Sequence, residues 1–215
     1  MPPNPTSPAP LSTAALVLYS AALIGLLALS GWRPYDLATW VMEVAPVVVV
    51  LGLLWATRRR FPLTPLLYAL IFVHAVVLML GGHYSYARVP LGDWMRDALG
   101  LARNPYDGIG HFMQGFVPAV AARELLLRRT GLQRGAWLFV IVTAVCLAVS
   151  AIYELIEWGA AIALGQGAEE FLGTQGDPWD TQKDMALAWI GAMAAQWLLS
   201  RWHDRQLAAP EVGSA

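Results

Sequence analysis

Long apolar stretches constrain this chain more than any other feature of its sequence. A helix of about 20 mostly apolar residues spans the hydrocarbon core of a bilayer, where lipid leaves the backbone no hydrogen-bond partner outside the helix itself. The sequence contains six such stretches, at residues 13–31, 37–57, 63–82, 109–127, 136–158 and 184–202. It therefore predicts an all-α, polytopic transmembrane bundle of about six spanning helices.

The composition agrees with a membrane protein and excludes other classes. Hydrophobic residues make up 57% of the chain and charged residues only 13%, whereas soluble domains carry about 25% charged residues. A formal net charge of -1 leaves no basic surface for nucleic acid. The single cysteine, Cys146, excludes an internal disulfide. The lipid bilayer is the expected partner, no nucleic-acid partner is expected, and the oligomeric state stays open.

The chain ends and the cationic residues predict one domain with a defined orientation. Residues 1–12 are rich in Pro and are expected to be disordered, as is the tail at 206–215, so residues 13–205 form a single transmembrane domain. With both termini in the cytoplasm, nine Lys and Arg residues lie on the cytoplasmic side and five on the outer side, which agrees with the positive-inside rule. The long connections 83–108 and 159–183 then face outward.

Ionisable residues gather at the outward ends of the predicted helices. Asp107 and His111 are four residues apart in YDGIGHFMQG, so they lie on one helix face. Glu154 and Glu157 are three residues apart in YELIEW and also share a face. Charge at this depth is costly and is often functional. These four residues are candidate catalytic residues, with the two Glu residues as candidate bases.

Three aspartates precede and open the last predicted helix, in GDPWDTQKDM. If this stretch is helical, Asp177, Asp180 and Asp184 share a face at the same membrane depth as the other candidates. Carboxylate oxygens are the ligands that hard divalent cations prefer. The three aspartates are therefore candidate metal ligands, and a divalent cation is the one cofactor that the sequence suggests.

Other polar residues at this level are candidates for binding a ligand. They are His83, Tyr84, Arg96 and Gln114. Glu43 lies in the outward third of the second predicted helix and can join the same group.

A purely structural interpretation competes with the functional one. An Asp at a helix N-terminus caps the helix and complements its dipole, and Asp107, Asp180 and Asp184 could each do only that. Glu154 and Glu157 could be bridged to His111 or to an Arg as links between helices. The sequence leaves the two interpretations equally open.

Four motifs carry a family resemblance. They are HYSYARVPLGDW, RNPYDGIGHFMQGFVPAVAARELL, YELIEWGAA and TQGDPWDTQKDMALAWIGA. Over residues 70–200 the chain resembles the YjdF-type inner membrane proteins of bacteria, while its first two predicted helices match only in hydrophobic character. The resemblance implies a multi-pass protein of the bacterial inner membrane. It implies no activity and no catalytic residues.

A more distant similarity is to VanZ-like proteins. Their pattern has Asp-x-x-x-His opening one helix, a Glu near the end of the next, and an Asp-containing stretch before the last. The corresponding positions are Asp107, His111, Glu154, Asp180 and Asp184. The VanZ-like pattern usually has Glu-x-x-Gln, and this chain has a second Glu in the last of those places. The similarity implies a role in the cell envelope.

Three functional hypotheses remain. The first is a membrane-embedded enzyme or binding site that acts on or binds an envelope lipid or lipid-linked molecule from the outer face. The second is a small transporter or permease component, which needs a polar path to the inner side. The third is a structural scaffold without catalysis. The sequence favours the first over the second because the inward halves of the last two predicted helices are almost wholly apolar.

Overall fold

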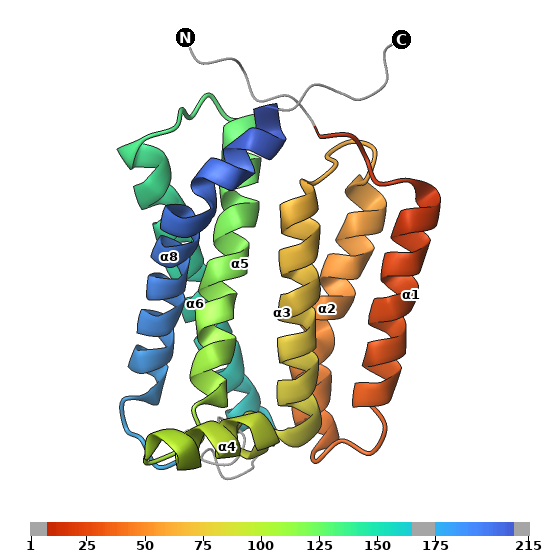
Figure 1. Ribbon diagram of the computed structural model, residues 1–215. Helices are drawn as coiled ribbons and strands as arrows, with labels where there is room; N and C mark the ends of the chain where they lie inside the picture. Colours follow the sequence, from red (N-terminus) through yellow and green to blue (C-terminus); the bar gives the residue numbers. More distant parts are fainter. Residues whose placement is uncertain (1–7, 165–174, 209–215) are drawn as a thin grey trace.

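All regular elements in the part of the chain that the structure describes are helices. The structure is a computed structural model that describes residues 8–164 and 175–208. The helices are α1 (Thr13–Ser30), α2 (Leu37–Thr57), α3 (Pro65–Tyr84), the short 3-10 helix η1 (Tyr86–Arg88), α4 (Pro90–Leu99), α5 (Tyr106–Arg129), α6 (Ala136–Leu164) and α8 (Asp180–Ala208) (Figure 1). The predicted all-α fold is confirmed.

The expected disordered ends fall mostly outside the described residues. Residues 1–7 and 209–215 are not among the residues that the structure describes. Residues 165–174, in the second long connection, are also outside the described part. Within the described part, α8 continues to Ala208 and so includes the first residues of the expected tail.

Side-chain caps fix where the first three helices begin. Ser12, Asp36 and Thr64 each precede a helix and accept a hydrogen bond from the backbone N–H three residues later. The hydrogen bond from the Thr39 N–H holds the pKa of Asp36 below its usual range. The caps mark where the polar connections end and the apolar helices begin. The three helices start within two residues of the predicted positions.

The long helices form one bundle with two halves (Figure 1). In one half α1 and α2 pack on α3, and in the other α5, α6 and α8 pack on one another. Contacts between α3 and α5 join the halves. The helix α4 lies across one end of the bundle, where α5 and α8 begin. We call this end the outer end, after the predicted orientation, and the opposite end the inner end.

Four helices have the length and composition to cross a membrane. They are α1, α2, α3 and residues Ala136–Ala163 of α6. The helices α5 and α8 carry more charge, but they have 24 and 29 residues and stand in the same bundle. The start of α1 and the end of α8 lie at the inner end (Figure 1). Six crossings and cytoplasmic termini therefore remain predictions that this arrangement accommodates.

Two exposed tryptophans mark the thickness of the apolar belt. Trp137 and Trp158 stand near the two ends of α6 and are 74% and 60% exposed. Their 21-residue separation corresponds to about 31 Å of helix, close to the thickness of about 30 Å of a bilayer core. Val140 and Ile152 between them are also exposed. Since indole favours the headgroup interface, this surface matches a bilayer.

The helix α4 is a feature that the sequence did not reveal. It lies in the connection 83–108 and exposes Leu91, Trp94 and Leu99, while Asp93 and Arg96 form an ion pair. An amphipathic helix across the end of a bundle is typical of one that lies in the membrane interface. Its apolar residues recur at helical spacing, but with ten residues it is far shorter than the spanning helices that the apolar runs predict.

The charges on α5 near the inner end are paired. Glu124 is fully buried and accepts hydrogen bonds from Arg128 at 2.6 Å and from the Thr64 hydroxyl at 2.8 Å. His203 Nε2 lies 3.1 Å from the same carboxylate, and Arg123 lies 3.0 Å from His203 Nδ1. This network ties α3, α5 and α8 together at the inner end.

The orientation can be tested with single-cysteine labelling. Asp97 on α4 and Gln133 between α5 and α6 are exposed at opposite ends, and the native Cys146 is fully buried. We expect Asp97→Cys to react with a membrane-impermeant maleimide in intact spheroplasts. Gln133→Cys should react only after permeabilisation, and the wild type with Cys146 alone should not react. The reverse pattern would invert the bundle in the membrane.

Candidate metal and headgroup site

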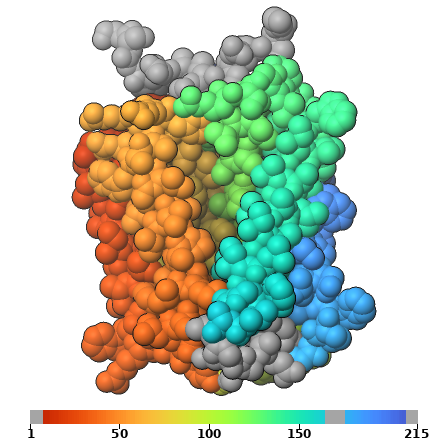
Figure 2. Space-filling view, turned by 180° about the vertical axis from the view of Figure 1, so that it is seen from behind, coloured from red at the N-terminus to blue at the C-terminus, as the bar shows by residue number. Residues whose placement is uncertain are grey.

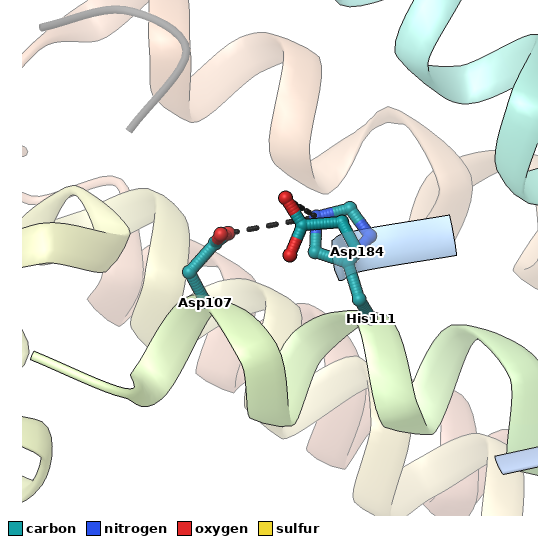
Figure 3. A group of neighbouring side chains, drawn as sticks. All are labelled: Asp107, His111 and Asp184. Carbon is teal, nitrogen blue, oxygen red and sulfur yellow. Dashed lines mark ion pairs between the residues drawn. The ribbon is translucent and has the colours of Figure 1, made fainter. Parts of the chain in front are cut away.

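Three helices bring carboxylates around one histidine at the outer end. His111 Nε2 lies 3.6 Å from Asp107 Oδ1 on α5 and 3.9 Å from Asp184 Oδ2 on α8. Its other ring nitrogen, Nδ1, lies 3.7 Å from Glu154 Oε1 on α6. The carboxylate side chains are only 4–12% exposed. The structure thus brings these four residues together, and Figure 3 shows Asp107 and His111 projecting from α5 toward Asp184.

Gln114 orients the histidine ring. Its Oε1 lies 3.1 Å from His111 Nδ1, so Nδ1 carries the proton and donates it to this oxygen. The lone pair of the neutral ring is then on Nε2, which faces Asp107 and Asp184. A hydrogen bond of this kind on the distal nitrogen fixes the tautomer of a metal-ligating histidine.

The atoms that face Nε2 have the spacing of a metal site. One ligand atom each from Asp107, His111 and Asp184 lies within 4.8 Å of the others. Metal bonds of about 2.0–2.2 Å place neighbouring ligand atoms of a tetrahedral site about 3.4 Å apart, so small side-chain shifts would complete the coordination. Asp184 Oδ1 and Glu154 Oε1 are buried without a hydrogen-bond partner among the described residues. The donor set and the unsatisfied Asp184 oxygen both fit a divalent cation at Nε2, whereas Glu154 Oε1 lies on the Nδ1 side of the ring.

Asp177 and Asp180 form ion pairs of their own, although the charge of Asp180 still acts on Asp107, Glu154 and Asp184. Arg103 donates to Asp180 and lies 3.7 Å from Asp177, and Lys183 also pairs with Asp177. The Lys183 ammonium holds the pKa of Asp177 below its usual range. Of the three predicted metal ligands, only Asp184 therefore faces His111.

Asp107 lies in the first turn of α5, where it complements the helix dipole, but Asn104 accepts the hydrogen bond from the first N–H of the helix. The Tyr106 N–H at the start of α5 donates to Asn104 Oδ1 at 3.0 Å. Asn104 is 2% exposed, and its amide also donates to the Val89 carbonyl and to Asp93. The carboxylate of Asp107 is left facing His111.

Three other residues predicted to bind a ligand lie elsewhere. His83 Nδ1 lies 2.8 Å from the Ser30 carbonyl, so it links α3 to the turn after α1. Tyr84 is partly exposed and packs edge-on against His83. Arg96 pairs with Asp93 and Asp97 on α4. These contacts of His83, Tyr84 and Arg96 do not involve the group around His111.

A large cavity opens beside the histidine. It has a volume of about 640 Å³, and its wall includes His111, Asp107 and Gln114 of the site. Glu157 and Glu43 line the same cavity, where Tyr153 donates to Glu43 Oε2 at 3.3 Å. Seen from behind, the molecule is hollowed between α2 and the pair α5 and α6 (Figure 2).

Two tyrosines at this cavity were not predicted from the sequence. Tyr86 on η1 and Tyr153 on α6 line it with the acids. Gly81 and Gly110 make room for the Tyr86 ring, and a Cβ at Gly110 would lie 2.8 Å from that ring. Only the position of Tyr153 beside Glu154 in the chain could have indicated a role for either residue.

Comparison with known proteins identifies the family. A family model described as "Predicted membrane protein (DUF2238)" matches residues 15–205. The chain belongs to this family. It is 55% identical over 194 residues to the inner membrane protein YjdF of Escherichia coli (strain K12), a match that covers 89% of this chain and 93% of that protein. No solved structure gave a significant match.

These matches decide two expectations from the sequence. The YjdF-type resemblance and the inner-membrane location are confirmed, in agreement with the four apolar helices. The more distant VanZ-like similarity receives no support from the family model or from the relative.

Close packing of α5 on α8 positions the site in this DUF2238 chain. Gly115 lies against the Ala188 backbone carbonyl, and Gly191 lies against the Phe112 carbonyl. A Cβ at either glycine would overlap that oxygen. Small residues allow such backbone approach between membrane helices. The contact lies one turn from His111 on α5 and from Asp184 on α8, so it sets the distance between their side chains.

A matched pair of glycine variants tests this packing. Gly115→Ala forces α5 and α8 apart because a backbone carbonyl cannot rotate away, and we expect a loss of about 2–3 kcal/mol in stability. Gly52→Ala on α2, where nothing lies within 4 Å, should cost nothing. Thermal unfolding of the purified proteins in detergent measures both. Equal stability of the two variants would show that the close approach is not needed.

Proposed function

We propose that this protein binds a divalent transition-metal cation between Asp107, His111 and Asp184 and uses it to bind the headgroup of an envelope lipid or lipid-linked molecule at the outer membrane face. The observation that carries this proposal is the pair of carboxylates facing His111 Nε2 at 3.6 and 3.9 Å. Mixed imidazole and carboxylate ligands suit Zn²⁺ or Mn²⁺.

The charge balance of the buried group supports a bound cation. Carboxylates with little exposure are costly unless they are paired or bind a metal. Arg103 forms direct ion pairs with Asp180 and Asp177, and its single positive charge also acts on Asp107 and Asp184. A dication balances Asp107 and Asp184, which face Nε2, while Glu154 lies on the other side of the ring, 3.7 Å from Nδ1.

The arrangement of ligands supports binding of a further molecule. Three protein ligands leave a coordination position open, as in zinc sites that bind substrate or water. The cavity adjoins the group, because Asp107 and His111 line its wall together with Glu157 and Glu43. An oxygen of a phosphate headgroup fits the open position, and Glu157 is then the candidate base for hydrolysis or group transfer.

Two alternative functions are less well supported. A transporter needs a polar path inward, but the inner part of the cavity is lined by aliphatic side chains, and the acid on α5 beyond it, Glu124, is fully paired. A scaffold needs a polar cluster whose members satisfy one another. Asp184 Oδ1 and Glu154 Oε1 have no hydrogen-bond partner among the described residues, which favours a site that binds something.

Metal content of variants tests the proposal and its ligand set. Purified protein equilibrated with Zn²⁺ or Mn²⁺ and then desalted should retain one equivalent per chain, measured by mass spectrometry of the metal. His111→Ala and Asp184→Asn should lose it. Gln114→Leu should weaken binding by about 10–100-fold, because it removes the partner of Nδ1.

Asp177→Asn is the matched control, since it removes an aspartate of the same stretch that lies in a separate ion pair. It should retain the metal. The proposal is wrong if His111→Ala binds as the wild type does, or if Asp177→Asn loses as much metal as Asp184→Asn.

A further inference from the structure

The cavity beside His111 changes character along its length. Its outer part is lined by polar side chains, which include Glu43, Tyr153 and Glu157 beside the metal-binding group. Its inner part is lined by the aliphatic residues Val50, Leu54, Leu67, Ile71, Ala121 and Leu125. A cavity with one polar and one apolar end fits an amphiphile, with the polar group at the outer end.

The apolar part is long enough for a lipid chain. On α2 the lining extends from Glu43 to Thr57, 14 residues later, which corresponds to about 21 Å of helix. Half of a bilayer core is about 15 Å thick. A hydrocarbon chain that begins beside Glu43 can therefore remain in the cavity past the middle of the membrane. The volume of about 640 Å³ lies within the range of small-molecule sites, about 300–1,000 Å³.

The cavity opens sideways toward the bilayer. The helix α2 packs on α3, and α6 packs on α5 and α8, so a hollow remains between α2 and α6 (Figure 2). Leu53 on α2 and Val149 on α6 line the cavity and are also 54% and 42% exposed. These two residues lie at an apolar rim on the lipid-facing surface, where a lipid in the bilayer reaches the cavity without crossing water.

A buried histidine offers a hydrogen bond inside the cavity. His74 on α3 lines the wall, and its Nε2 is buried with no hydrogen-bond partner among the described residues. It lies ten residues from the outer end of α3, whereas His111 lies five residues from the start of α5, so it is about 7–8 Å deeper in the membrane. The ester carbonyl of a glycerolipid lies a few atoms below its phosphate and is an acceptor for this nitrogen.

We infer that the cavity holds one acyl chain of a glycerophospholipid, which enters from the bilayer between α2 and α6 with its phosphate toward His111. The inference rests on the proposed function for its headgroup end and specifies the class of lipid. It assigns the chain to the aliphatic inner part of the cavity and an ester carbonyl to His74.

Photo-crosslinking tests where the chain lies. The protein is reconstituted in vesicles of phosphatidylethanolamine and phosphatidylglycerol that contain a phosphatidylglycerol with a diazirine near the methyl end of one acyl chain. Mass spectrometry of the crosslinked peptides should find the label at the cavity residues Leu54, Leu67 and Ala121 in preference to lipid-facing residues of α1 at the same depth. Labelling without this preference overturns the inference with no variant needed.

Two substitutions on α6 provide a matched comparison. Val149 and Val145 are one turn apart and 42% and 41% exposed, but only Val149 lines the cavity. Val149→Trp should lower cavity labelling about tenfold, which corresponds to about 1.4 kcal/mol of binding free energy. Val145→Trp should leave labelling unchanged. Equal labelling of the two variants, whether high or low, contradicts the inference.

Metal content measured on the same samples separates this inference from the proposed function. Val149→Trp should keep its metal and lose cavity labelling, because the two ends of the site are independent. Cavity labelling in a protein that binds no metal supports the acyl-chain site and rejects the metal-dependent headgroup site. Metal binding without cavity labelling supports the metal-dependent headgroup site and rejects the acyl-chain site.

Discussion

The central constraint in this protein is the burial of three carboxylates around one imidazole. Asp107, Asp184 and Glu154 lie 3.6–3.9 Å from the ring nitrogens of His111. Carboxylates so close and so poorly hydrated cannot all be charged without a cation or shared protons. Each carboxylate is carried by a helix that packs against the other two. The glycine contacts between α5 and α8 hold these two helices close, so the side chains of the group cannot move apart. The fold thus holds several negatively charged groups close together, and a divalent cation neutralises part of that charge.

The two ends of the bundle use buried acids in different ways. At the inner end, Glu124 on α5 is paired with Arg128 of the same helix, with Thr64 before α3 and with His203 on α8. At the outer end, Asp184 Oδ1 and Glu154 Oε1 have no hydrogen-bond partner among the described residues. The acids are buried at both ends, so burial alone does not explain why only the outer acids have oxygens without a hydrogen-bond partner. A structural role accounts for the inner network, and a ligand accounts for the outer group.

Helical periodicity predicted the part of this site that depends on single helices. The spacing of Asp107 and His111 on α5, and the depth of Glu154 and Asp184, follow from an apolar run and its ends. The pairing of Arg103 with Asp180 depends on the path of the chain before α5, which has no periodic signal. The cavity depends on how α2 and α6 are placed around α3 and α5, and apolar sequences pack equally well in other arrangements. The glycine contacts depend on helix register, which the sequence pattern does not determine.

The direct test of the central claim is the magnetic environment of a bound ion. Electron spin echo spectroscopy of the protein loaded with Mn²⁺ should show coupling to one histidine nitrogen, because His111 Nε2 is the only imidazole atom assigned to the ion. The coupling should disappear in His111→Gln and remain in His74→Phe, which alters another histidine at the cavity. Bound Mn²⁺ without nitrogen coupling, or coupling that persists in His111→Gln, would contradict a site built around His111.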